Sequence, residues 1–263
     1  ATAFGNYDSR NTDDTAVHIR SGATLKLSTV HTSGYMFLYK RFFIAGTGKN
    51  GQGAILVDVS DTKNGYIGAI ALDGDATINV PTGKRVNFQY GNIRPLSHTL
   101  TFTGGERIYF ADNEKFVGPG EVVMDTDVKF DFTVHTGGFA DSTPRLKLTA
   151  KGGNEIRLIE QSKVCPWSAQ YADLDITGTF TLIHSHMSVN STPVNHWSEL
   201  VNTWVGDVSL PTETDALILS CDQTAKHCLF ALKGNVSGLG SVQTFKSTGD
   251  GFARIAYEGT NTF

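Results

Sequence analysis

Short apolar stretches alternate with polar, glycine-marked breaks along most of the chain. Apolar residues at every second position are typical of a β-strand with one buried face. Turn signals such as Asp73-Gly74-Asp75 and Gly118-Pro119-Gly120 separate the stretches. The predicted strands are Ala23–Leu27, Ile55–Val59, Ile67–Leu72, Ala76–Val80, Val86–Tyr90, Thr99–Thr103, Arg107–Phe110, Val122–Met124, Lys129–Val134, Arg145–Thr149, Glu155–Ile159, Leu174–Ile176, Thr179–His184, Ala216–Ser220 and Ala253–Tyr257. This spacing predicts an all-β protein, as a sandwich, a barrel or a solenoid.

The segment Leu229–Phe263 has the clearest internal order. A strand at Leu229–Leu232 runs into Gly234-Asn235, and a second corner, Gly249-Asp250-Gly251, precedes the strand Phe252–Tyr257. Glycine supplies the positive φ that such corners need. This order resembles the passenger-associated repeats of autotransporter-type surface proteins. In that family one such unit is one rung of a right-handed parallel β-helix.

Two earlier stretches are similar to the same repeat. Ile44–Ile55 (IAGTGKNGQGAI) resembles its glycine-rich rung turn, and Leu72–Ile78 resembles the strand entry that follows it. The resemblance implies a right-handed parallel β-helix-like solenoid over residues 21–263, after an N-terminal cap or lead-in over residues 1–20. Strand alternation alone leaves a pair of β-sandwich domains open as the alternative.

One segment, Asn190–Val205, departs from the pattern. Trp197, Leu200, Val201 and Trp204 recur at the spacing of a helix face, and Pro193 suits a first helical turn. We expect a short helix or an irregular insertion near residues 190–205. Because loops carry specific contacts in repeat proteins, this segment is a candidate binding region.

Composition limits the class of partner. The net charge of −4, with both signs spread along the chain, argues against nucleic acid as a partner. No apolar run reaches the roughly 20 residues of a transmembrane helix, and no signal peptide remains at Ala1. Low charge and many Thr, Ser and Asn residues favour a secreted or cell-surface protein whose signal peptide has been removed.

The chain has three cysteines, Cys165, Cys221 and Cys228. The simpler expectation is three reduced, buried thiols, because free cysteine is among the most buried residue types. The alternative is a disulfide between Cys221 and Cys228, which flank a short polar stretch and would pair in an oxidising compartment.

Histidine and aspartate supply weak candidates for chemistry. His184 and His186 share one face of a predicted strand, as metal ligands can, although a polar strand end explains them equally. Asp125 and Asp127 alternate along a strand-like run, where repulsion between carboxylates would create an acid/base pair. Asp141 lies in Phe139–Thr143, which faintly resembles the active-site loop of aspartic proteases but has Thr143 where that family has glycine.

Aromatic residues form a second set of candidates, because sugar rings stack on flat aromatic faces. They group as Phe37, Tyr39, Phe42 and Phe43; Trp167 with Tyr171; and Trp197 with Trp204. Of these we expect Trp197 and Trp204, beside His184 and His186, to form the binding site. The competing interpretation is that the rings fill the core.

The sequence thus leaves three functions open. The first is a non-catalytic surface or extracellular protein that contacts host glycans or glycoproteins such as mucin. The second is a hydrolase or lyase acting on such material, for which the sequence shows no Lys, Arg and Asp triplet on one face. The third is a structural spacer within a longer passenger. No nucleotide- or dinucleotide-binding motif is present, so no cofactor is expected.

Overall fold

The computed structural model describes residues 16–28, 35–38, 40–60, 64–89, 91–111, 115–133, 137–160, 169–186, 201–221, 227–246 and 252–262. Within these ranges the chain is nearly all β, apart from one 3-10 turn, η2 (Lys49–Gly51). None of the described residues belongs to a helix of the length and apolarity that a membrane span requires.

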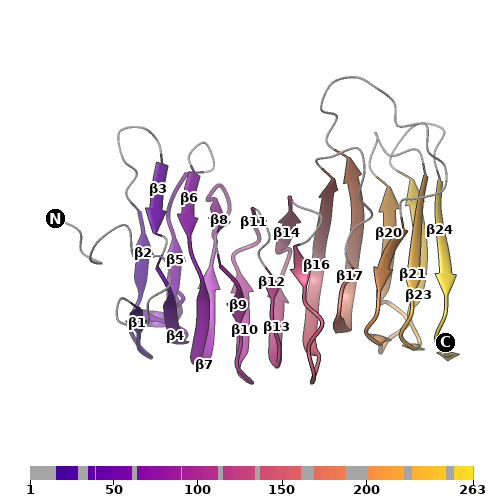
Figure 1. The fold of residues 1–263 in the computed structure, drawn as a ribbon, viewed down its shortest axis with the longest axis horizontal. Helices are drawn as coiled ribbons and strands as arrows, with labels where there is room; N and C mark the ends of the chain where they lie inside the picture. Colours follow the sequence, from indigo (N-terminus) through magenta and orange to yellow (C-terminus); the bar gives the residue numbers. More distant parts are fainter. Residues whose placement is uncertain are drawn as a thin grey trace.

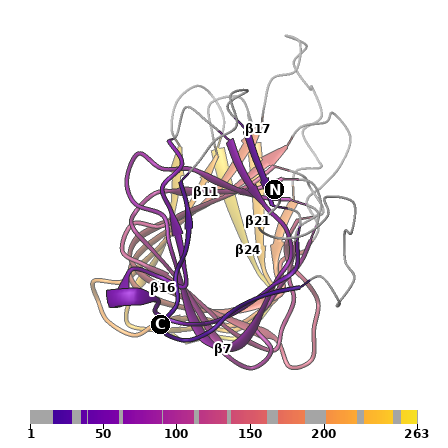
Figure 2. The same ribbon diagram turned by 90° about the vertical axis from the view of Figure 1, so that its left-hand side faces the viewer.

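Successive turns of the chain stack along one axis as a parallel β-solenoid (Figure 1). Viewed along that axis, the turns superpose as a ring (Figure 2). The strand pairings divide the wall into three faces, A, B and C. The chain passes through them in that order in each turn.

Each face is a column of parallel strands. Face A holds β1 (Val17–Ile19), β4 (Phe42–Gly46), the first half of β7 (Ile70–Asn79), β9 (Ile93–Arg94), β12 (Lys115–Phe116), β15 (Gly138–Phe139), β18 (Val201–Trp204), β21 (His227–Leu232) and β24 (Phe252–Tyr257). Face B holds β2 (Leu25–Leu27), β5 (Ile55–Val57), the second half of β7, β10 (Thr99–Thr103), β13 (Gly120–Asp125), the first halves of β16 (Leu146–Glu160) and β17 (Ala172–His186), β19 (Val208–Leu210), β22 (Val236–Gly238) and β25 (Asn261–Thr262). Face C holds β3 (Tyr35–Leu38), β6 (Asn64–Ile67), β8 (Val86–Phe88), β11 (Arg107–Phe110), β14 (Lys129–Phe132), the second halves of β16 and β17, β20 (Ala216–Cys221) and β23 (Ser241–Lys246).

The C-terminal repeat pairs as the glycine corners predict. β24 runs parallel to β21, with Ile255 opposite Phe230, and β25 runs parallel to β22. The pairings of the N-terminal turns are parallel as well. The prediction of a parallel solenoid is therefore confirmed, and the β-sandwich alternative is wrong.

Two predicted boundaries shift. β1 lies within residues 1–20, the expected lead-in, and already pairs with β4. Val201–Trp204, at the end of the expected helix, instead forms strand β18, which pairs with β21. The helical spacing fails there because Trp204 packs in the solenoid core as one of the alternating residues of a strand. Residues 190–200 lie outside the described ranges.

Phenylalanine fills the middle of the solenoid. Phe88, Phe110 and Phe132 are register partners on three successive strands of face C. The ring of Phe110 stacks on Phe132 at a centroid distance of 4.7 Å and on Phe88 at 5.3 Å. Phe116 reaches from face A and meets Phe110 edge-on at 5.2 Å. Because parallel strands place equivalent side chains directly above one another, the rings form a continuous column.

A ladder of side chains joins the corners between faces A and B in the C-terminal turns. Asp173 Oδ1 accepts a hydrogen bond from the backbone N–H of Asp207 at 3.1 Å. Asp207 Oδ1 accepts from Asn235 N at 2.7 Å, and Asn235 Oδ1 accepts from Thr260 N at 3.0 Å. Each corner thus receives its acceptor from the preceding turn.

Glycine precedes each of the last three ladder residues, at Gly206, Gly234 and Gly259. A Cβ on Gly234 would collide with the carbonyl oxygen of Gly206, and one on Gly259 would collide with that of Gly234. The corners therefore stack closely because this position carries no side chain.

Candidate functional site

A hollow on the outside of face A, which we call the notch, arises from the size of side chains on three neighbouring strands. Outward-facing register partners on β4, β7 and β9 follow one order, large, small and large. One row, within the strands, is Phe43–Ala71–Arg94, and the second is Arg41–Ala69–Asn92, the residues immediately before the three strands. Since the middle strand contributes only alanine, the longer side chains on the two flanking strands project further from the face and border a hollow.

The notch encloses about 320 Å³. This volume lies at the lower end of the range of about 300–1,000 Å³ for small-molecule sites. Gly91 lets the chain pass close to the floor, because a Cβ there would lie 2.5 Å from Ala69 Cβ. Leu96, which is 45% exposed, lines the notch as well.

The backbone beside the notch is strained. Leu96 and Ser97 have φ values of 54° and 69°, in the left-handed region that disfavours residues other than glycine. Such a conformation costs about 1–3 kcal/mol and persists only where surrounding contacts hold it. At this corner the N–H of Ser97 donates to Pro119 O at 2.8 Å.

The notch is cationic. Among the described residues, Arg41 and Arg94 line it and no acidic residue does. The Arg94 side chain is exposed, and among the described residues no carboxylate lies within ion-pair distance of it. Asn92 Oδ1 accepts a hydrogen bond from Lys115 N at 3.3 Å, which anchors the Asn92 amide at the edge of the notch.

An aromatic ring stands in the notch wall. Phe43 is half-buried, and His18 on β1 stacks on it at a centroid distance of 4.8 Å with the planes 7° apart. His18 Nδ1 in turn lies 3.1 Å from Asp73 Oδ2. Of the aromatic group that contains Phe43, Phe42 belongs to the core, whereas the side chains of Phe37 and Tyr39 lie outside the described residues. Phe43 is therefore the one described member of this group that lines the notch.

Face C carries a cluster of charges that was not apparent in the sequence. Arg107 Nη1 donates to Asp131 Oδ1, and Arg107 Nη2 donates to Glu155 Oε1 at 3.0 Å. Arg157 also donates to Glu155, at 3.4 Å, and Lys129 is the register partner of both Arg107 and Glu155. Face C therefore does carry Lys129, Arg107 and Asp131 together, which the sequence did not reveal. Consecutive turns bring residues about one turn apart in sequence side by side.

Both carboxylates of this cluster pair with Arg107. Burial raises the pKa of the Asp131 carboxyl, while the charges of Arg107 and Arg157 oppose that rise. Burial would lower the pKa of Arg107, but the charges of Asp131 and Glu155 raise it. Asp131 is only 2% exposed, so a substrate has no access to it from outside. The cluster fits a role in holding three turns together.

The strand alternation that suggested an acid/base pair of aspartates is interrupted. β13 ends at Asp125, and Thr126 and Asp127 follow with φ values of 50° and 59°. This left-handed corner breaks the alternation that was expected to bring Asp125 and Asp127 to one side. Asp141 lies between β15 and β16, at the corner between faces A and B, whereas Asp125 and Asp127 lie at the corner between faces B and C.

Trp204 belongs to the core. It is 2% exposed, its ring lies 5.7 Å from that of Phe139, and its Nε1–H donates to Ala172 O at 2.8 Å. Trp204 is therefore a core residue. The prediction that it stacks on a ligand at the surface is wrong. Trp197, Trp167 and Cys165 lie outside the described residues.

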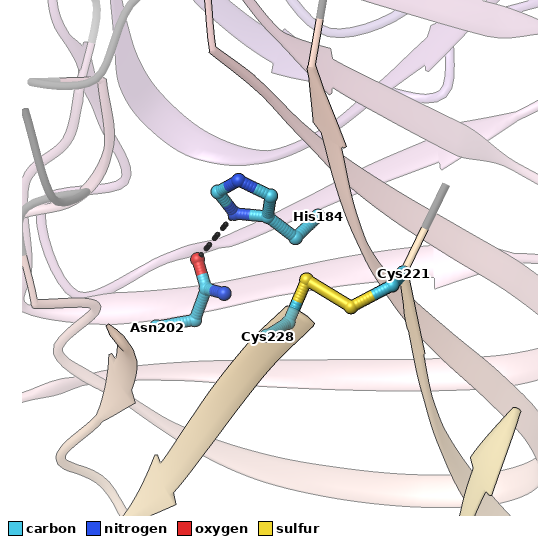
Figure 3. The surroundings of a disulfide bond; sticks show 4 residues. All are labelled: His184, Asn202, Cys221 and Cys228. Carbon is cyan, nitrogen blue, oxygen red and sulfur yellow. Dashed lines mark hydrogen bonds between the residues drawn. A yellow bond between two sulfur atoms is a disulfide. The ribbon is translucent and has the colours of Figure 1, made fainter. Parts of the chain in front are cut away.

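His184 is also internal. It occupies the core column of face C that Phe132 and Leu158 occupy in the preceding turns, and it is 1% exposed. Its Nδ1 lies 2.9 Å from Asn202 Oδ1 on β18, and Figure 3 shows the two side chains pointing toward one another. His184 is thus not a surface contact. The side chain of His186 lies outside the described residues, and the described part of the chain contains no cluster of three or more potential metal ligands.

A disulfide lies one turn further along the solenoid than this pair. Cys221 is the register partner of His184, and it is bonded to Cys228 on β21 (Figure 3). Both cysteines are buried. The expectation of reduced thiols is therefore wrong for these two residues, and the alternative of a bridge is confirmed. The disulfide and the His184–Asn202 pair link faces C and A in successive turns.

Reduction of this disulfide is expected to lower the free energy of unfolding by about 2–3 kcal/mol, because it closes a short loop with a sequence separation of 7. Denaturant unfolding with and without reductant measures the loss. A Cys221→Ala/Cys228→Ala variant should show the same loss and no response to reductant. A count of three free thiols in the denatured, unreduced protein would rule the bridge out.

No protein-family model, curated protein or solved structure matches this chain. Its function is therefore inferred from its own residues and their arrangement.

Proposed function

We propose that the protein is an exported surface or extracellular β-solenoid that contacts host glycans or glycoproteins, such as mucin, without catalysis. The notch is the observation that carries this proposal. It offers a half-buried aromatic ring, an amide and two guanidinium groups around a small floor, and this combination suits a sugar ring with its hydroxyl groups.

Two other features support export and the passenger-like relationship. A disulfide such as Cys221–Cys228 forms and persists mainly in oxidising compartments. The glycine corners at Gly206, Gly234 and Gly259 stack as the corners of a passenger-type repeat would. A hydrolase or lyase is less well supported, because Asp131 in the charged cluster on face C is buried and paired with Arg107.

Replacing Phe43 by alanine is expected to weaken retention on immobilised mucin by about tenfold or more, because an aromatic anchor usually dominates the energy of such a contact. The melting temperature should change little, since Phe43 faces outward and is only partly buried. Retention and melting are measured on the same samples, and the mucin is assayed for released products.

Phe245→Ala is the matched control, because Phe245 is a 57% exposed phenylalanine on β23, far from the notch. It should leave retention unchanged. If the wild-type protein binds mucin and Phe43→Ala binds equally well, the notch is not the contact site. If the wild-type protein is retained by no glycan or glycoprotein, the proposed function is wrong.

A further inference from the structure

The notch has a charge opposite to that of the whole molecule. The chain carries a net charge of −4, whereas the described residues that line the notch include two arginines and no carboxylate. Lys115, beside Asn92 in the next turn, extends the same row with a further cationic residue. A local positive field in a small hollow selects a ligand with negative charge at that point.

The two guanidinium groups approach from different sides. Arg41 immediately precedes β4, and Arg94 ends β9, with β7 between these strands. Adjacent strands lie about 4.8 Å apart, so the flanking backbones are separated by about 10 Å across the alanine floor. A ligand of roughly the width of one sugar ring fits between them and meets the exposed Arg94 guanidinium at one side.

Arginine is the side chain suited to this task. Its planar fork donates two parallel hydrogen bonds to a carboxylate or sulfate group, and it is weakly hydrated compared with an ammonium group. Phe43 and Leu96 add apolar surface beside the cationic groups. A ligand with an apolar ring face and an attached oxyanion matches both parts of the notch.

We propose that the notch binds an acidic sugar unit, whose carboxylate or sulfate group pairs with Arg94 while its ring lies against Phe43. This inference rests on the proposed glycan-binding function and names the chemical class of the glycan. Because the notch spans three turns and about 320 Å³, it recognises one acidic unit of a longer glycan rather than an extended charged polymer.

The test compares binding of the full chain to four immobilised glycans: sialylated mucin, the same mucin after removal of sialic acid, a polyuronate and a sulfated glycan. The wild-type protein is expected to bind at least one acidic glycan about tenfold more tightly than the desialylated mucin. Arg94→Gln should remove about that factor, since a hydrogen bond to a charged group typically contributes this much. The acidic glycan that binds identifies the source of the oxyanion.

Arg145→Gln is the matched control. Arg145 is partly exposed, lies before β16 away from the notch, and its loss changes the net charge equally. Equal losses in Arg94→Gln and Arg145→Gln, equal binding of acidic and desialylated glycans, or an unaffected Arg94→Gln variant would each overturn the acidic-sugar inference and leave glycan binding standing. Absence of binding to every glycan, including the desialylated mucin, overturns both.

Discussion

Phe110→Ala is expected to lower the free energy of unfolding by about 3–5 kcal/mol, because it removes a fully packed ring from the centre of the core. The Phe110 ring contacts Phe88 in the preceding turn and Phe132 in the following one, and it meets Phe116 edge-on from face A. Its removal leaves a cavity between turns, which a rigid stack cannot close. Denaturant unfolding measures the loss.

The loss should also be local. In a solenoid each turn contacts only its neighbours, so weakening one interface in the middle partly uncouples the two halves. Hydrogen exchange is therefore expected to rise most in β8, β11 and β14. Phe110→Leu, which keeps most of the buried volume, should cost less than half as much. A loss for Phe110→Ala no greater than that for the exposed Phe245→Ala would contradict the prediction.

Arg107→Ala is the second large expected effect, also about 3–5 kcal/mol. Arg107 holds two carboxylates, Asp131 and Glu155, that belong to the two following turns. Without it, Arg157 is the remaining cation whose charge acts on the buried Asp131 carboxylate. The cost comes mainly from leaving a buried charge poorly paired rather than from the strength of the ion pair itself.

A double variant, Arg107→Leu/Asp131→Leu, distinguishes these contributions. It should recover much of the stability lost in Arg107→Ala, because both members of the buried pair are removed together. Arg145→Ala, which breaks a partly exposed pair with Asp173, should cost less than about 1 kcal/mol. The prediction fails if the Arg107 and Arg145 variants lose equal stability.

The fold was predictable because glycine residues mark its corners in the sequence. Gly234-Asn235 and Gly259-Thr260 mark positions where one turn must approach the next too closely for a side chain. The period-2 strands between them supply the inward residues of the core. These two local signals predict strands and tight corners, and the resemblance of their order to passenger-associated repeats favoured a parallel solenoid over a sandwich.

The notch and the charged cluster were not predictable, because they depend on register between turns. The length of a turn varies: Thr99 and Glu121 are 22 residues apart, whereas Asp207 and Asn235 are 28 apart. Without a fixed period, the sequence does not indicate that Ala71 separates Phe43 from Arg94. Arg107 and Asp131, 24 residues apart, are likewise adjacent only because of the register between their turns.

The sequence also misplaced His184 and Trp204. Alternation of apolar and polar residues identifies the two sides of a strand. It does not show which side faces the core when polar residues also occupy inward positions. His184 lies inside because Asn202, from the next turn, satisfies its Nδ1, and Trp204 lies inside because Ala172 O accepts from its indole. Both partners are distant in sequence, so burial of these polar atoms has no local signal.

The corner ladder gives the molecule a direction. Asp173, Asp207 and Asn235 each offer an acceptor to the turn that follows, so the last corner depends on the one before it, and that one on its own predecessor. A chain delivered N-terminus first, from a ribosome or through a translocation pore, would present each acceptor before the N–H that needs it. Each new turn can then form its corner hydrogen bond on the turn already folded. Delivery from the C-terminus would instead present each corner N–H before its acceptor.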